Sequence, residues 1–267
     1  MKWWVVGVVG LSVAILALWV LFFFASPWLA HLAGLEQKIG DAGDWGDAFG
    51  GFNALITAVG FIAVIATFVI QFNALRDQQL DQRRQQFDVT FFELLRLMRE
   101  LRDEITFSHS GDYLAQTQMK RPTEPFRGNQ AVSAALAEAR YWILKERSSP
   151  TPITQSRVAD LYTQYIHKRA EKGLGPYFRV MYSILSRVKK ATFLSEAEKE
   201  EYGNLLRAQM ASHEVALAAI NSLAPVAKDM KDLLAYFHFL KYLPPGNFRT
   251  FMQRLLPKEA FEARAES

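Results

Sequence analysis

The fold class depends first on an uncharged stretch, FGGFNALITAVGFIAVIATFVIQF, at residues 49–72. It forms the centre of 28 uncharged residues between Asp47 and Arg76. A helix needs about 20 apolar residues to cross the hydrocarbon core of a bilayer, which is about 30 Å thick. The stretch therefore predicts a transmembrane helix over residues 49–72.

A second apolar run lies at the start of the chain. Residues 3–24 follow Lys2 and contain no charge over 22 positions. A cleaved signal peptide is the alternative, because small residues follow at Ala25, Ser26 and Ala30. The apolar region of such a peptide is only about 7 to 15 residues long, however. We therefore favour an uncleaved anchor and expect the two spans to form a transmembrane hairpin.

The second span contains a row of small residues, Gly50, Ala54 and Ala58, at intervals of four. Such a row lets helix backbones approach closely in a bilayer. It would serve either the packing of the two spans, which we favour, or oligomerisation of the chain. Neither span contains a charged residue. This argues against an ion or proton pathway, since such pathways need ionisable groups or exposed carbonyls within the membrane.

The charges that flank the spans predict the orientation. The loop of residues 25–47 holds four acidic residues and one lysine, whereas Lys2 precedes the first span and Arg76, Arg83 and Arg84 follow the second. Basic flanks stay on the cytoplasmic side of a membrane. We therefore expect a multi-pass protein of the bacterial inner membrane, with both termini in the cytoplasm and the lipid bilayer as its first partner.

Beyond the second span the sequence predicts helices. No Gly or Pro interrupts residues 61–110, and apolar residues recur there at helical spacing. No alternating strand pattern follows. The predicted fold is all-α: a transmembrane hairpin over residues 1–72, a helical neck and first helix of the soluble domain over 73–107, a cytoplasmic helical-bundle domain over 108–257 and a tail over 258–267.

Breaker residues divide the cytoplasmic domain further. Glycines and prolines predict an irregular connection over residues 108–130 and a break at Gly173, Gly175 and Pro176. The helices expected around them cover residues 130–146, 154–172, 177–190, 195–223 and 225–243.

Composition and motifs exclude several classes of function. The chain has no cysteine, which removes disulfide scaffolds, thiol nucleophiles and cysteine-ligated metal sites. It also lacks a glycine-rich phosphate loop, the metalloprotease and serine-hydrolase motifs, and any paired metal-ligand spacing. We therefore expect no cofactor and no metal, and the sequence favours a role other than catalysis.

The first group of candidate site residues lies near Pro176. Tyr177, Arg179 and Tyr182 follow it, and Arg179 and Tyr182 are three apart, so they share a helix face. The proline favours a helix start at this point. We expect these three side chains to line a binding site or to take part in a structural polar network.

The second group lies on the helix predicted from Ser195, which begins with the capping-box spacing of Ser195 and Glu198. Arg207, Glu214 and Asn221 follow at intervals of seven, so they share one face but stand too far apart to bond directly. Their partners must come from elsewhere. We interpret them as a polar network between helices; a ligand or active site made by the same groups is the alternative.

Arg207 and His213 together resemble the Arg-x4-6-His motif of the HEPN ribonucleases, an all-α class. The motif is loose, because Arg102 and His109 match it as well. Moreover, His213 falls on the predicted apolar stripe with Met210 and Leu217, where a packed histidine is expected. The soluble part, residues 73–267, has a net charge of +6 from 29 basic and 23 acidic residues, which would attract RNA without supplying chemistry. RNA is therefore a partner that we do not favour.

The arrangement of these segments resembles the phage abortive infection protein family of bacterial two-span membrane proteins. The resemblance spans roughly residues 43–243. It implies a role in defence against bacteriophage, without an established reaction, and marks Tyr177, Arg179, Arg207, Glu214 and Asn221 as important positions. The stretches that show it are GDWGD at 43–47, FGGFN at 49–53, FFELL at 91–95, YFRVMY at 177–182 and LRAQMASHE at 206–214.

Two functional hypotheses follow. The favoured one is a membrane-anchored defence protein whose cytoplasmic helical domain senses or binds a phage or host component, with a protein partner or a second copy of the chain. The alternative is a membrane-tethered HEPN-like ribonuclease that uses Arg207 and His213.

Overall fold

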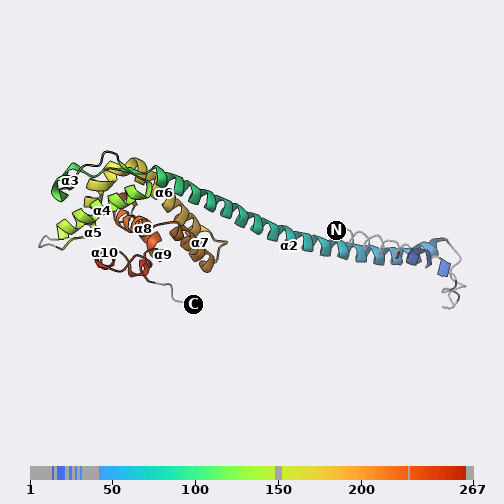
Figure 1. Ribbon diagram of the computed structural model, residues 1–267. Coiled ribbons are helices and arrows are strands. Elements are labelled where there is room, and N and C mark those ends of the chain that lie inside the picture. Colours follow the sequence, from blue (N-terminus) through green and yellow to red (C-terminus); the bar gives the residue numbers. More distant parts are fainter. Residues whose placement is uncertain are drawn as a thin grey trace. The chain divides into compact units, whose positions relative to one another are not determined.

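The protein is described from a computed structural model (Figure 1). The structure describes residues 42–147, 152–227 and 229–262, and also positions 14, 17–21, 24–25, 28 and 31; for residues 42–49 and 52 it gives the backbone alone. Most of the predicted first span, the loop after it and the end of the tail lie outside these residues. The chain divides into two compact units, Met1–Gln78 and Gln79–Ser267.

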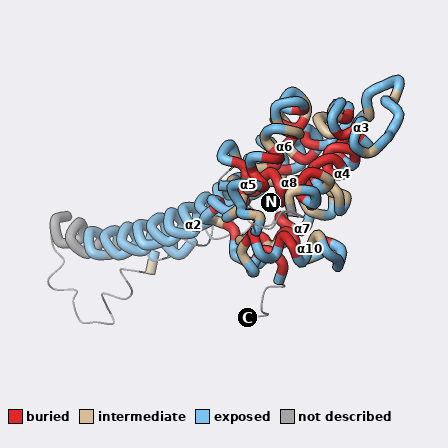
Figure 2. The backbone as a smooth tube through the Cα atoms, turned by 90° about the vertical axis from the view of Figure 1, so that its left-hand side faces the viewer, coloured by how far each residue is buried: buried red, intermediate tan, exposed pale blue. Residues whose placement is uncertain are grey.

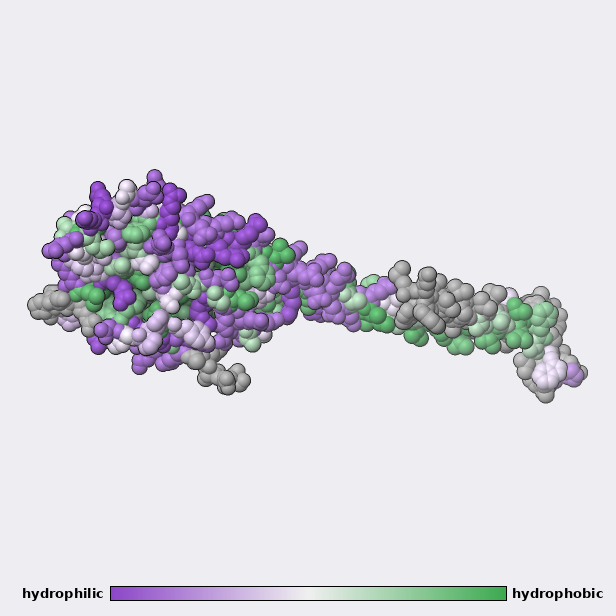
Figure 3. Space-filling view, viewed as in Figure 1, coloured by the Kyte–Doolittle hydropathy of each residue, from purple (hydrophilic) through white to green (hydrophobic). Residues whose placement is uncertain are grey.

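The apolar stretch is helical. It belongs to helix α2, Ala42–Glu104. From Asn53 to Glu104, α2 is the one helix within the described part of the chain that is long and apolar enough to cross a membrane, with a mean hydropathy of 2.4 in its most apolar window and none of that window buried. Figure 2 shows the apolar stretch of α2 exposed, and Figure 3 shows hydrophobic side chains on the surface of this stretch. One apolar helix is thus present; the predicted hairpin is not confirmed, because the first span falls largely outside the described residues.

The last turns of α2 belong to the second unit. Phe87, Phe91, Leu95 and Met98 recur at intervals of three or four, and all four are buried. This spacing places them on one face of the helix. The rings of Phe87 and Phe91 meet the ring of Tyr202 edge to face, with centroids 5.2 and 4.8 Å apart. The apolar residues that recur at helical spacing in the sequence therefore form the packing face of α2.

The connection predicted as irregular contains short ordered elements. Strand β1, Thr106–Phe107, pairs with β2, Phe126–Arg127, in antiparallel register. Helix α3, Gly111–Thr117, lies between them and starts at Ser110, whose side chain accepts a hydrogen bond from the backbone N–H of Tyr113. Helix α4, Gly128–Arg147, follows and confirms the helix predicted there. The described residues are otherwise predominantly helical, so the all-α class is confirmed.

The predicted break at Gly173 to Pro176 is wrong. Helix α5, Gln155–Tyr162, passes through a π-helical turn, η1, Thr163–His167, into α6, Lys168–Lys190, and Pro176 lies inside α6. The reason is packing: Leu174, Tyr177 and other apolar residues of α6 are buried on one face, and this burial outweighs the breakers. The close packing at Gly173 favours a residue without a side chain, because a Cβ atom there would stand 3.2 Å from the Cα of Ile105.

The single helix predicted from Ser195 to Leu223 is also wrong. Helix α7, Glu196–Ala208, ends before helix α8, Ser212–Asn221, begins, and Ala211 between them is extended, with φ −76° and ψ 158°. The buried carboxylate of Glu214 accepts the backbone N–H of Ala211 at 2.6 Å. This bond caps the start of α8 and so stabilises the break.

The helices of the C-terminal segment are shorter than the sequence predicted. A 3-10 turn, η2, Pro225–Ala227, and helix α9, Met230–Tyr236, replace the helix expected over residues 225–243. Helix α9 ends because His238 takes a left-handed conformation, with φ 48°. Helix α10, Asn247–Met252, and a 3-10 turn, η3, Lys258–Ala260, follow, and Ala260 and Phe261 are buried.

Helix α8 forms the centre of the second unit. Every residue from Glu214 to Asn221 is buried. It contacts α4 and α5, while α6 contacts α7 and α9 (Figures 1 and 2). An otherwise apolar central helix therefore carries two polar side chains, Glu214 and Asn221, into the interior, and each has to find a partner or a cavity.

Candidate functional site

The Glu214 carboxylate is fully buried, with 0% of the residue exposed. It accepts a hydrogen bond from the Tyr177 hydroxyl at 2.7 Å and from the Ala211 backbone N–H at 2.6 Å. The Arg102 guanidinium stands 3.8 Å away and donates to the Gln209 carbonyl at 3.1 Å. We call Arg102, Tyr177 and Glu214 the Glu214 cluster.

Three separate elements supply the Glu214 cluster. Arg102 comes from the last turn of α2, Tyr177 from α6 and Glu214 from the first turn of α8. Burial, and next the negative charge of Glu214, raise the pKa of the Tyr177 hydroxyl well above its ordinary value. The hydroxyl thus stays protonated and donates. The geometry is that of a satisfied polar network that holds three helices together.

Arg207 lies apart from this cluster. Its guanidinium stacks over the Tyr242 ring at 4.4 Å from the centroid and donates to the Asn204 side chain at 2.6 Å. A cavity of about 250 Å³ adjoins it. One terminal nitrogen, Nη1, is buried without a hydrogen-bond partner among the described residues. Burial lowers the pKa of the guanidinium from its ordinary value. The predicted stripe of Arg207, Glu214 and Asn221 on one helix is therefore wrong, because the break after α7 separates Arg207 from the other two.

His213 is not on a packed stripe. It is partly exposed at the start of α8, and its Nε2 lies 2.6 Å from the side-chain oxygen of Asn129 on α4. The stripe was predicted from one continuous helix, but the break at Ala211 separates Leu206 and Met210 from the residues of α8. His213 lies in the first turn of α8, where it is only partly buried, whereas Leu217 in the same helix is fully buried. His213 is also absent from the lining of the cavity beside Arg207.

A second buried carboxylate, Glu138, was missed by the sequence analysis. It accepts hydrogen bonds from the Ser110 hydroxyl at 2.5 Å, from His109 Nδ1 at 3.0 Å and from the Arg169 guanidinium at 3.1 Å. The His109 ring stacks on Tyr113 with centroids 4.4 Å apart. Glu138 lies on an apolar, alanine-rich helix, α4, and a lone acidic residue on such a face is the one signal that could have found it.

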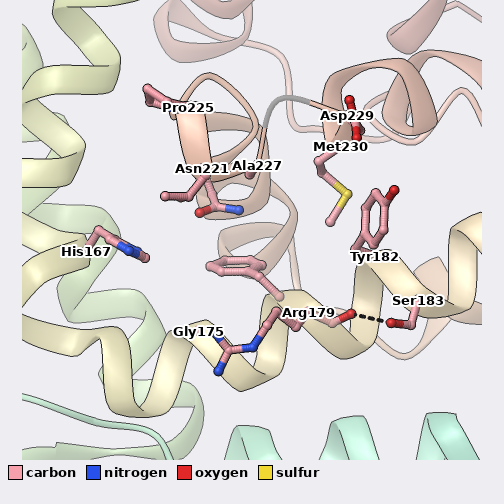
Figure 4. Close-up of a pocket in the computed structure, with 12 residues that line it drawn as sticks. His167, Gly175, Arg179, Tyr182, Ser183, Asn221, Pro225, Ala227, Asp229 and Met230 are labelled. Atoms are coloured by element: carbon pink, nitrogen blue, oxygen red, sulfur yellow. Dashed lines mark hydrogen bonds between the residues drawn. The ribbon is translucent and has the colours of Figure 1, made fainter.

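A pocket with a volume of about 530 Å³ lies between α6 and the segment from the end of α8 to the start of α9 (Figure 4). It brings together three of the predicted residues, Arg179, Tyr182 and Asn221, which the sequence had placed in two different groups. Its lining also includes residues that the sequence analysis did not single out: His167, Gly175, Phe178, Ser183, Pro225, Val226, Ala227, Asp229 and Met230.

Asn221 and Arg179 contribute differently to this pocket. Asn221 is only 3% exposed, and its amide has no hydrogen-bond partner among the described residues. Arg179 is 69% exposed and pairs with Glu171 at 3.5 Å. Figure 4 shows the Asn221 side chain directed into the pocket and the Arg179 guanidinium beside Gly175. The six predicted residues thus divide among the Glu214 cluster, the Arg207 cavity and this pocket. Within the described ranges, no group of three or more His, Asp or Glu side chains could hold a metal ion.

A comparison with known protein families relates one segment of the chain to a family. Residues 169–248 match the family of putative phage abortive infection proteins. The resemblance inferred from the sequence is confirmed over these residues. No curated protein and no solved structure matches the chain.

The abortive infection match covers α6 to the start of α10, which contains the whole of the larger pocket except His167. It also contains Tyr177 and Glu214, but neither Arg102 nor the second buried carboxylate, Glu138. The segment shared with the abortive infection family is thus the one that holds all six residues predicted from the sequence.

Proposed function

We propose that the chain is a membrane-anchored defence protein of the abortive infection type, whose helical unit senses or binds a phage or host component. The observation that carries the proposal is the family match over residues 169–248. The matched segment includes the pocket residues Arg179 and Asn221 and the buried Glu214. A sensing role therefore has both a pocket and a fixed framework within the matched segment.

The apolar part of α2 supports anchoring. Its side chains between Leu55 and Phe72 are exposed, among them Phe61, Ile65 and Phe68. Soluble proteins rarely expose a continuous apolar surface of this size, and such surfaces mark sites of membrane or protein interaction. A lipid bilayer is the partner that suits a helix with this length and composition, and we propose that it is the bacterial inner membrane.

Recognition fits the buried polar groups better than catalysis does. The carboxylates of Glu138 and Glu214 each hold several hydrogen-bond donors, and both are fully buried. A general acid or base has to reach a substrate proton within about 3 Å. These two carboxylates are enclosed by their own partners, so they serve the fold.

The ribonuclease alternative would need Arg207 and His213 at one phosphate. Arg207 instead stacks on Tyr242, and His213 contacts Asn129. We therefore do not propose a ribonuclease activity for this chain.

The experiment is a phage challenge of bacteria that express the full chain, an empty vector, or the variant Ile62→Arg/Ile65→Arg. Each charge at the centre of a span costs about 2.5 to 3.5 kcal/mol of insertion free energy, so the double variant should leave the membrane fraction and lose protection. The matched control is Gln78→Arg/Gln79→Arg, which adds the same charges to the polar part of α2.

Plating efficiency, survival of infected cells and the membrane fraction of the protein are measured together. Lower plating efficiency with the full chain and the control supports the proposal. Equal plating with the chain and the empty vector contradicts the defence role, and full protection by the double variant in the soluble fraction contradicts the anchor.

A further inference from the structure

The pocket between α6 and α9 is suited to a small organic ligand. Its volume of about 530 Å³ falls within the range of about 300 to 1,000 Å³ that is typical of small-molecule sites. Apolar residues such as Phe178, Met230 and Val226 share its lining with the polar residues Arg179 and Asn221. Sites for small molecules combine an apolar lining with a few polar groups in just this manner.

The most informative residue of the pocket is Asn221. The residue is only 3% exposed, its side chain has no hydrogen-bond partner among the described residues, and it is directed into the pocket (Figure 4). Because the amide faces the pocket, its donor and its acceptor are both available to a bound molecule. A ligand that offers an acceptor and a donor side by side would match this amide, because the amide presents a donor group and an acceptor.

A nucleobase has such an edge. Asparagine pairs with bases through both of its polar atoms. A base is also planar, so it can stack on an aromatic ring, and Phe178 and His167 supply rings in the same lining. The His167 imidazole has no hydrogen-bond partner in the described part of the chain, and Figure 4 shows it at one side of the pocket.

The entrance of the pocket supplies a cation. The side chain of Arg179 is 69% exposed, and its one acidic partner in the described residues, Glu171, stands at 3.5 Å. A guanidinium has five N–H donors, so this pairing leaves donors for a phosphate. Asp229 also lines the pocket, and a carboxylate there can accept hydrogen bonds from ribose hydroxyls.

From these features we propose that the pocket is a nucleotide-binding site, in which Asn221 recognises the base edge, Phe178 and His167 contact its ring, and Arg179 binds the phosphate. The site goes beyond the defence role proposed above. Binding is measured on purified protein, so its failure would leave the phage experiment unaffected.

The test measures thermal unfolding of the full chain in detergent with AMP, GMP, CMP and UMP as probes, each beside its nucleoside and beside inorganic phosphate. A ligand that binds the folded state raises the melting temperature as its concentration rises. At least one nucleotide should do so, its nucleoside should do so more weakly, and phosphate alone should have no comparable effect.

Two variants assign the effect to the pocket. Asn221→Leu replaces an unpartnered amide by an apolar side chain of similar volume, so it should keep or raise the melting temperature without ligand and abolish the rise with nucleotide. Arg179→Ala should weaken nucleotide binding about tenfold or more by removing charge-assisted hydrogen bonds. The matched control is Arg187→Ala, an exposed arginine of α6 outside the pocket, which should bind as the wild type does.

Several results would overturn the site: no shift with any of the four nucleotides, an equal shift with phosphate alone, or an unchanged shift in Arg179→Ala. An Asn221→Leu variant that melts well below the wild type would show that the amide serves the fold, and would overturn the site as well.

Discussion

Two tyrosines of the helical unit are fully buried, and they differ in one respect. Tyr177 donates its hydroxyl to Glu214 at 2.7 Å, whereas the Tyr162 hydroxyl has no hydrogen-bond partner among the described residues. Both rings are at most 1% exposed. The pair therefore separates the effect of a buried hydrogen bond from the effect of a buried ring.

The first prediction uses this pair. Tyr177→Phe should lower the free energy of unfolding by about 1 to 3 kcal/mol, because it leaves the Glu214 carboxylate without one of its donors. Tyr162→Phe should be neutral or stabilising, since it removes an unpartnered hydroxyl. Glu214→Ala should be the most harmful of the three. Denaturation of the detergent-purified chain checks this order, and equal effects of the two tyrosine variants would contradict the Glu214 cluster.

His213 is the subject of the second prediction. Its Nε2 bonds to Asn129 between α8 and α4, so His213→Ala and Asn129→Ala should cause the same modest loss of stability, about 0.5 to 1.5 kcal/mol. Both variants should keep phage protection at normal protein level. Loss of protection in His213→Ala alone, with cleaved RNA in infected wild-type cells, would instead support the ribonuclease alternative.

At the scale of single elements, the junction of α7 and α8 is incompletely capped. The Glu214 carboxylate satisfies the backbone N–H of Ala211, but alanine has no side-chain oxygen to accept a hydrogen bond in return. Helix α7 has both halves of the same motif, because Ser195 and Glu198 bond each other reciprocally. Helix α8 therefore has half of a capping box.

The third prediction completes this box. Ala211→Ser should raise the free energy of unfolding by about 0.5 to 2 kcal/mol, because serine at this position accepts an N–H of the first turn. Ser195→Ala should lower it by a similar amount at the complete box. Melting temperatures of both variants test the prediction, and a destabilised Ala211→Ser would mean that the junction has no room for a hydroxyl.

The sequence could not reveal this junction, because it contains neither glycine nor proline, and the apolar residues Leu206, Met210, Leu217 and Ile220 keep a helical period across it. Conversely, the glycines and the proline near residue 175 were read as a break that the buried face of α6 overrides. Local sequence signals therefore missed the break between α7 and α8 and predicted a break in α6 that is absent. At both places, contacts between helices determine where a helix ends. Local signals succeeded for the packing face of α2 and for the cap at Ser195, where the pattern and the contact lie within a few residues.

The same reasoning explains how much of the site was predictable. Tyr177 and Glu214 were singled out, but their partner Arg102 lies on α2, far away in the sequence. Arg179 and Asn221 were placed in different groups, although one pocket holds both. Periodicity shows which side chains share a helix face, but it does not show which helices meet.

For the whole molecule, the orientation in the membrane remains the main prediction. The acidic loop of residues 25–47 and the basic residues after the apolar stretch of α2 predict that both termini lie in the cytoplasm. A reporter that is active only outside the inner membrane should be silent after Ser267 and active near Gln37. A reporter active in the cytoplasm serves as the control and should give the reverse pattern. Activity of the external reporter after Ser267 would contradict the orientation.

The π-helical turn at Thr163–His167 has a consequence for changes in chain length. A π-turn holds an extra residue compared with an α-helix, and each residue of an α-helix turns the chain by about 100°. The wide turn therefore sets the phase between α5, which buries Val158 and Leu161, and α6, which presents Phe178 and Arg179 to the pocket. Deleting the exposed Gln164 would rotate one helix against the other, so this segment should tolerate substitutions far better than a deletion of a single residue.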